Sequence, residues 1–231
     1  MRKRTIILGS VLVLGLAIIA ISLLGVGPAL AEKKEHKSTS DVFWTFESDD
    51  PAYSNPNGTS TLSRTKNGIS ANYKTSGLTR GNAETLWFVV FNYPEECEDG
   101  PYQCSPLDFG DTDAQGDFFI ASGHVIGADG KGNYGGHLNV GDVSGSGLAE
   151  MLGCQDCTPG LIEPESALVV SAIHDHGPAL TGQALKEQIS TFLGDCDKGF
   201  LGNEFGFATG PDDIPVEKGY CSTIQMSPHA P

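Results

Sequence analysis

The sequence predicts an all-β protein, an antiparallel β-sandwich or barrel that carries one short helix and is held by disulfides. Short apolar segments of strand length recur along the chain, and turn-forming residues separate them; the 231 residues include 30 Gly and 13 Pro. One segment alone has helical spacing. Six cysteines add a third observation, because an even count in an exported protein usually means disulfide bonds.

Four strands are expected in the first half of the chain, over residues 41–46, 61–66, 69–74 and 84–93. The turn residues Asn67 and Gly68 join the second and third strands as a hairpin, with Ile69, Ala71 and Tyr73 on one face. The fourth strand, ETLWFVVFNY, is apolar on both faces. This pattern is typical of a central, buried strand.

Residues 117–142 give the clearest hairpin signal, because two apolar runs flank a glycine-rich turn. Alternation along the first strand places His124 on the same face as Phe118. A two-residue turn at positions 129–130 would bring His137 diagonally opposite His124, roughly 7 to 8 Å away. A bulge at the neighbouring glycines would reverse this arrangement.

The second half of the chain is expected to hold a strand over residues 167–177, a helix over 184–192 and a last strand over 220–226. In the strand ALVVSAIHDHG, the side chains of His174 and His176 share a face because they are two residues apart. The helix is predicted from apolar residues at helical spacing, followed by a glycine that ends it.

The N-terminal residues have the pattern of an export signal. Basic residues, an uncharged apolar run and the small-x-small sequence Ala-Leu-Ala predict a signal peptide over residues 1–31. The apolar run is also long enough to act as a signal anchor in a membrane. We expect a flexible tether over 32–40, then a single β domain over 41–231 that is secreted or lies on the outer face of the cell envelope.

The six cysteines fit an oxidising compartment. Local spacing suggests three bonds, although other pairings remain open: Cys97 with Cys104, Cys154 with Cys157, and Cys196 with Cys221. The pair at 154 and 157 has the CxxC spacing of redox sites. Glycines and a proline surround it, so a structural clip is the favoured interpretation.

The net charge of −15 disfavours nucleic acid and anionic lipid as partners. Contact with a membrane is expected only if the N-terminal segment is retained. The sequence has no phosphate-binding loop, no dinucleotide-binding glycine motif, no HExxH motif and no hydrolase elbow, so a nucleotide is not expected either. An extracellular protein or an envelope component is the partner class that remains.

Four histidines are candidates for a Zn or Cu site, namely His124, His137, His174 and His176. They would converge if the 117–142 hairpin had its two-residue turn and the 167–177 strand lay beside it. The alternative is that the histidines are structural, either hydrogen-bonded to the backbone or buried in the core.

An acidic segment offers a second cation site, for Ca. Its oxygen ligands would come from alternate positions, as in a calcium loop: Asp111, Asp113, Gln115 and Asp117. The acidic residue that closes such a loop is missing, and a solvated acidic loop is the alternative. Separately, Asn57 begins the only N-glycosylation sequon, Asn-Gly-Thr.

Several stretches resemble a family of exported, functionally uncharacterised prokaryotic β proteins: GNAETLWFVVFNYPEEC, ASGHVIG, GGHLNVGDVSG, HGPA and EQISTF. The resemblance covers residues 81–229 and implies a secreted single-domain β protein, with no activity attached. Its pattern includes His124, His137 and His176, whereas His174, the 154/157 cysteine pair and a 200–215 insertion depart from it. A looser similarity links the chain to chordin-type CHRD domains, which are also extracellular and all-β.

These observations favour a non-catalytic extracellular domain that binds a partner or contributes to an envelope structure. No nucleophile motif supports an enzyme, and a rigid β scaffold supplies surfaces more directly than chemistry. The alternative is a histidine-ligated Zn or Cu protein, or a metalloenzyme that uses such a site.

Overall fold

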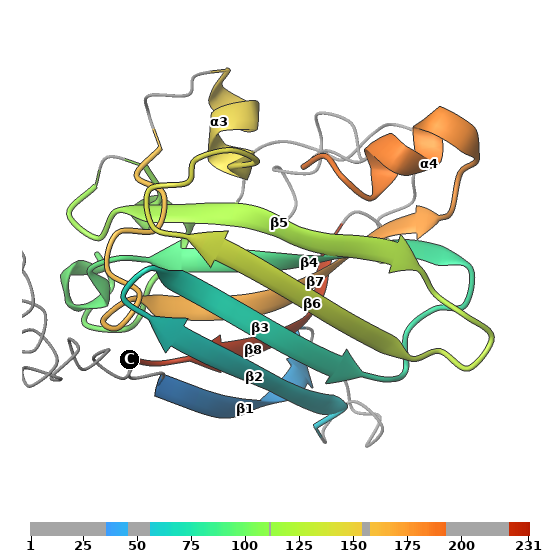
Figure 1. Cartoon of the computed structure of the whole chain (residues 1–231), viewed down its shortest axis with the longest axis horizontal. Helices are drawn as coiled ribbons and strands as arrows, with labels where there is room; N and C mark the ends of the chain where they lie inside the picture. The colour runs from blue at the N-terminus through green and yellow to red at the C-terminus, as the bar shows by residue number, and fades with distance from the viewer. Residues whose placement is uncertain (1–35, 46–55, 111, 154–157, 193–221) are drawn as a thin grey trace, which may run out of the picture. The chain divides into compact units, whose positions relative to one another are not determined.

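Eight strands form one antiparallel sheet in the computed structural model, which describes residues 36–45, 56–110, 112–153, 158–192 and 222–231. The strands are β1 (His36–Trp44), β2 (Gly58–Thr65), β3 (Gly68–Thr75), β4 (Asn82–Phe91), β5 (Gly116–Val125), β6 (Gly132–Asn139), β7 (Leu168–Pro178) and β8 (Ser222–His229). They follow the order β5-β4-β7-β8-β1-β2-β3-β6 (Figure 1). The predicted all-β antiparallel fold is confirmed.

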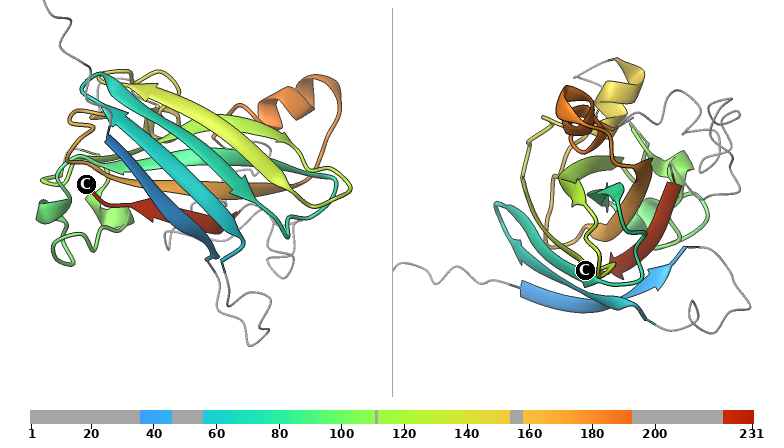
Figure 2. Two further views of the ribbon diagram at one scale, coloured as in Figure 1. Left: turned by 60° about the horizontal axis from the view of Figure 1, so that its bottom comes forward. Right: turned by 90° about the vertical axis from the view of Figure 1, so that its right-hand side faces the viewer.

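The sheet curls until its two edge strands, β5 and β6, lie against each other, which makes a nearly closed barrel (Figure 2). Side chains that alternate along each strand fill the interior, as in other small barrels. The middle of the interior is apolar, and its largest buried side chains are Leu62, Ile69, Phe88, Phe119 and Leu138. The fold therefore has a packed core rather than a pore.

Two predicted elements appear as expected. β2 and β3 form the hairpin, and the alternate residues Ile69, Ala71 and Tyr73 are buried. Its turn lies one residue earlier than predicted, at Lys66 and Asn67, because Gly68 already belongs to β3 and pairs with Thr65. β4 is an interior strand next to the edge strand β5, paired with β5 on one side and β7 on the other, and all but one of its residues are buried. A strand that is apolar on both faces suits this place, because the barrel core covers one face and loops and helices cover the other.

β5 and β6 do not form the hairpin predicted for residues 117–142. β5 pairs with β4 and β6 pairs with β3, and no backbone ladder joins the two strands. The residues between them use their backbone groups elsewhere: Ile126 N donates to Asn82 O, and Gly130 O accepts from Leu78 N. The predicted two-residue turn is therefore wrong, and the unpaired boundary between β5 and β6 is called the seam below.

A bulge in β5 reverses the predicted face of His124. The ladder to β4 passes over Ala121, which is an extra residue on β5. As a result Phe118, before the bulge, packs on the outer face of the sheet, whereas the ring of His124 points inward and stacks on Tyr134. The prediction that His124 and Phe118 share a face is wrong, because strict alternation does not survive an inserted residue.

β1 begins at His36, so residues 36–40 of the predicted tether form a strand that pairs with β2. Two short helices lie outside the barrel, α3 (Gly147–Leu152) and α4 (Gly182–Gln188). α4 begins near the predicted helix and ends earlier. α3 was not predicted; it begins at the N-cap Ser146, whose Oγ accepts a hydrogen bond from Ala149 N.

Cys97 and Cys104 form the predicted disulfide, which lies between the short 3-10 helices η1 (Pro94–Glu96) and η2 (Pro106–Asp108). The bond closes a loop that follows β4. The other four cysteines, Cys154, Cys157, Cys196 and Cys221, lie outside the described residues, as does the predicted signal segment 1–31.

Arg64 on β2 points into one end of the barrel and is fully buried. Its guanidinium donates to carbonyl oxygens of two segments that close this end, at Pro164, Ala167, His229 and Ala230. Burial lowers the pKa of Arg64 to about 10, so the group stays charged at neutral pH. Charge-assisted hydrogen bonds thus hold the end of β8 against the barrel.

The closeness of the seam can be tested at Gly136 on β6. A Cβ at this position would collide with the Cβ of Ala121 and press on the ring of Phe88 at 3.0 Å. We expect Gly136→Ala to lower the free energy of unfolding by about 1–3 kcal/mol in denaturant titration, because the edges must move apart. Gly135→Ala is the matched control, since a Cβ there meets only Ala71 O at 3.8 Å. Equal losses in both variants would contradict a closed seam.

Candidate ligand site inside the barrel

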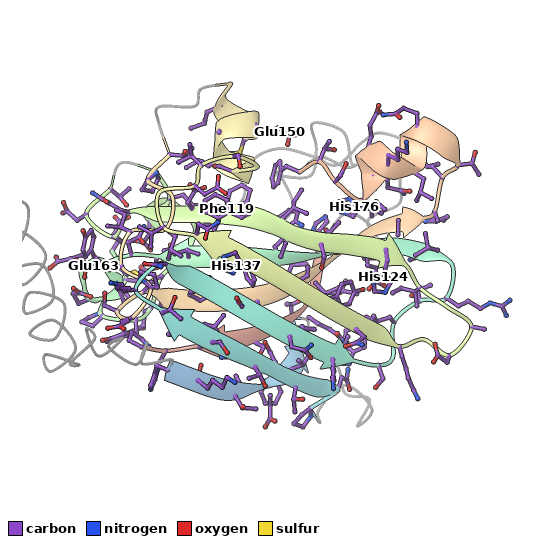
Figure 3. The ribbon with its side chains drawn as sticks, viewed as in Figure 1. Phe119, His124, His137, Glu150, Glu163 and His176 are labelled. Atoms are coloured by element: carbon purple, nitrogen blue, oxygen red, sulfur yellow. A yellow bond between two sulfur atoms is a disulfide. The ribbon has the colours of Figure 1, made fainter. Side chains whose placement is uncertain are left out.

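The four candidate histidines lie at three separate places. Figure 3 labels one histidine from each place, His124, His137 and His176, and His174 lies beside His176. His124 faces the interior at the end of β5, while His137 is exposed on the outside of β6, where its ring bonds to Ser70 and Asn139. His174 and His176 lie on the outer face of β7. Among the described residues no group of three or more His, Cys, Asp or Glu is placed to hold a metal ion. The predicted convergence fails because β5 and β6 do not pair.

His174 and His176 do meet each other, as their spacing predicts, with ring centroids 4.8 Å apart. His174 also stacks on Trp87 at 4.5 Å, and the Nε2 atom of His176 is 2.9 Å from Thr85 Oγ1. Burial lowers the pKa of His174 well below its ordinary value, so the ring is neutral. Both histidines belong to the aromatic layer that Phe192 completes on the outside of the sheet.

The last carboxylate of the predicted calcium loop, Asp117, binds groups of the protein itself. Asp117 is buried, and its oxygens accept hydrogen bonds from within the protein: Phe118 N, Ser146 Oγ and Gly160 N, at 2.8, 2.8 and 3.2 Å. Of the other predicted ligands, Asp113 is exposed and takes no part in this network. The backbone carbonyl of Gln115 accepts a hydrogen bond from the side chain of Asn92. Asp111 lies outside the described residues. Asp117 therefore fixes the loops around β5.

The sequon residue Asn57 is tied to the fold. Its backbone N–H donates to Val42 O, and its side-chain nitrogen is buried without a hydrogen-bond partner. A glycan is attached through that nitrogen. In the folded chain the side chain would have to turn outward before it could carry one.

The end of the barrel opposite Arg64 contains a buried polar cluster that the sequence reasoning missed. Glu84 on β4 is fully buried, and its Oε2 accepts a hydrogen bond from Tyr134 Oη on β6 at 3.1 Å. Asp175 on β7 is its cross-strand neighbour. Tyr73 on β3 packs edge-on against Tyr134, with ring centroids 6.3 Å apart. These four residues and Ser122 on β5 are called the Glu84 cluster below.

Glu84 and Asp175 share this interior but differ in their hydrogen bonds. The pKa of Glu84 is raised to about 9, mainly by burial and then by the charge of Asp175, while the hydrogen bond from Tyr134 opposes the shift. Burial also raises the pKa of Asp175, but its anion is stabilised by the amide of Asn82, at 3.0 and 2.9 Å, and by Gly177 N at 2.7 Å. At neutral pH Glu84 therefore holds a proton, while the hydrogen bonds from Asn82 and Gly177 favour the anion of Asp175.

Three oxygen atoms of the Glu84 cluster are buried and have no hydrogen-bond partner among the described residues: Tyr73 Oη, Glu84 Oε1 and Ser122 Oγ. They come from three strands. Tyr73 packs in the interior, and the register of β4 and β5 places Glu84 and Ser122 on the same inner face as Leu86. Buried polar atoms in native proteins are almost always hydrogen-bonded, to the protein or to a bound molecule. Arg64 Nε, Ser171 Oγ and Ser227 Oγ, elsewhere in the interior, are also unpartnered among the described residues, so what sets the Glu84 cluster apart is that its free oxygens accompany two buried carboxyl groups.

The seam passes beside this cluster. His124 on β5 stacks on Tyr134 of β6 across the seam, with ring centroids 4.4 Å apart and planes inclined by 21°. His124 is partly exposed, and burial of the rest of its ring lowers its pKa. Solvent thus reaches the ring of His124, and the ring that it stacks on, Tyr134, donates a hydrogen bond to Glu84. No backbone ladder crosses the seam at this stack.

Comparison with known proteins adds no relative. No protein-family model, no curated protein and no solved structure matches this chain.

The protonated state of Glu84 can be tested through stability. A carboxyl whose pKa is about 9 when folded and about 4.5 when unfolded stabilises the fold at low pH, and this contribution is lost as the pH rises from 4.5 to 9. We expect wild-type stability to fall relative to Glu84→Gln by up to about 1.4 kcal/mol per pH unit in this window, measured by denaturant titration. Glu165→Gln, at an exposed site, serves as the control. Parallel pH profiles for wild type and Glu84→Gln would contradict a neutral Glu84.

Proposed function

We propose that this protein is an exported, non-catalytic binding domain that holds a small polar molecule at the polar end of its barrel. The observation that carries the proposal is the set of three buried, unpartnered oxygens in the Glu84 cluster. Each buried group left unpaired costs about 1–3 kcal/mol. Three such groups at one place indicate that a bound molecule supplies the missing bonds.

A barrel end that served only as scaffold would be filled more cheaply by apolar side chains. The middle of the same barrel is built in that way, around Leu62, Phe88 and Leu138. The polar end instead combines two carboxyl groups with two tyrosines, and each of these four residues is more than nine-tenths buried. A cost of this kind is typical of a functional site, and ordered water is the competing occupant that the experiment below must exclude.

Binding is favoured over catalysis because the cluster lacks an activated nucleophile. A catalytic serine needs a base within hydrogen-bond reach. Ser122 Oγ has no hydrogen-bond partner, and His124, two residues along the same strand, places its ring against Tyr134 instead. Glu84 is protonated and so is not a base at neutral pH.

Export is supported by the N-terminal sequence pattern and by the disulfide between Cys97 and Cys104, a bond found mainly outside the cytoplasm. We place the domain in the extracellular space or on the outer face of the envelope, in agreement with the motif resemblance. No helix in the part of the chain that the structure describes is long and apolar enough to span a membrane. The acidic net charge argues against nucleic acid as a partner.

The two tyrosines of the cluster give a matched test. Tyr73→Phe removes a hydroxyl that makes no protein hydrogen bond, so the stability of the empty protein should change by less than about 0.5 kcal/mol. Tyr134→Phe removes the bond to Glu84 and should lower the free energy of unfolding by about 0.5–1.5 kcal/mol. Native mass spectrometry of the exported protein should show a bound small molecule in the wild type and its loss from Tyr73→Phe.

Wild-type protein that carries no bound molecule, together with a Tyr73→Phe variant that loses stability, would contradict the proposal. In that case the Tyr73 hydroxyl bonds to ordered water and the cluster is structural.

A further inference from the structure

We propose that the molecule held by the Glu84 cluster is a cation that carries a primary ammonium group. The inference rests on the proposed binding function and adds the charge and the donor chemistry of the ligand. It is drawn from the balance of charge in the barrel end, from the number of free oxygens and from the aromatic rings beside them.

The acidic groups of the polar end have no cationic partner among the described residues. The basic side chain at this end, His124, stacks on Tyr134, and burial lowers its pKa. The hydrogen bonds of Asp175 and Glu84 come from Asn82, Gly177 and Tyr134, none of which is cationic. No ion pair to either carboxyl is found among the described residues, and the only buried guanidinium described there, Arg64, lies at the other end of the barrel. Buried charges in proteins are normally paired. A cationic ligand would supply the missing partner.

The free oxygens match an ammonium group in number and type. Tyr73 Oη, Glu84 Oε1 and Ser122 Oγ can each accept one hydrogen bond, and a primary ammonium has three N–H donors. The rings of Tyr73 and Tyr134, set edge to face, offer π surfaces that attract a cation. A carboxylate ligand would meet the charge of Asp175 and is disfavoured.

Binding must be coupled to release of a proton. In the empty protein Glu84 is neutral. When the ammonium group binds, the O–H bond of the Glu84 carboxyl group breaks and the proton passes to the solvent. This leaves the Glu84 carboxylate beside the cation. The other titratable groups that face Glu84 come from β3, β5, β6 and β7. Burial and the charge of Glu84 raise the pKa of Tyr73 from β3 and of Tyr134 from β6, and burial lowers the pKa of His124 from β5. Burial raises the pKa of Asp175 from β7, and the hydrogen bonds from Gly177 and Asn82 oppose that shift.

The test uses methylammonium chloride as the probe, with sodium chloride at equal ionic strength as the reference and acetamide as the neutral control. Methylammonium, like a lysine side chain, stays protonated below about pH 10. We expect its affinity, measured by calorimetry on the exported protein, to rise about tenfold per pH unit between pH 7 and the pKa of Glu84. Calorimetry in buffers of different ionisation enthalpy should show about one proton released per ion bound at pH 7.

Two variants separate the contribution of proton release from Glu84 from that of the hydrogen bond to the Tyr73 hydroxyl. Glu84→Gln should remove the pH dependence, because no proton is left to release, and Tyr73→Phe should weaken binding roughly tenfold while the pH dependence persists. The second variant keeps every protein hydrogen bond described for the cluster, so it stays informative if the first unfolds.

The outcomes distinguish this inference from the proposed function. Binding of acetamide as tight as that of methylammonium, or binding of methylammonium without proton release, would overturn the cation while leaving a ligand site in place. If neither probe binds and native mass spectrometry shows an empty protein, the proposed function itself fails.

Discussion

The barrel closes without a backbone ladder between its edge strands, and this constraint shapes the site. One polar contact that joins the two sides of the seam is the hydrogen bond from Tyr134 on β6 to Glu84 on β4. It places a carboxyl group inside the barrel, where burial and Asp175 keep it protonated. The stack of His124 on Tyr134 and the close approach of Gly136 to Ala121 complete the closure by packing alone. The boundary with the fewest hydrogen bonds therefore lies beside the most polar part of the interior.

The two ends of the barrel show two ways to bury a charge. At one end the two terminal nitrogens of Arg64 donate to four backbone carbonyls, so the cation is used to hold the fold together, and only its Nε has no partner among the described residues. At the other end Glu84 accepts one bond from Tyr134, Asp175 accepts bonds from Asn82 and Gly177, and three oxygens have no partner among the described residues. A protein interior normally satisfies its polar groups. The difference between the ends is the reason to look for a ligand at the second one.

The strands were predictable because each buried face repeats every two residues, as at Ile69, Ala71 and Tyr73, and because β4 is apolar on both faces. The bulge at Ala121 was not, since a single inserted residue leaves no mark in composition, and it moved His124 from one face to the other. Sheet order was also hidden: sequence neighbours β5 and β6 became opposite edges. Glu84 did leave a signal in the sequence. It is an acidic residue that shares a strand face with Leu86 and Phe88, and such a pattern indicates a buried carboxyl group.

The account depends on a neutral Glu84 inside the barrel, and a direct titration of this carboxyl tests it. The carbon-13 resonance of its side-chain carboxyl, assigned by its disappearance in Glu84→Gln, can be followed by NMR from pH 4 to 10. The account predicts a midpoint at about 9. A midpoint near 4.5, the ordinary value for glutamate, would mean that Glu84 is already an anion at neutral pH and would contradict both its burial as a neutral acid and the coupled release of a proton.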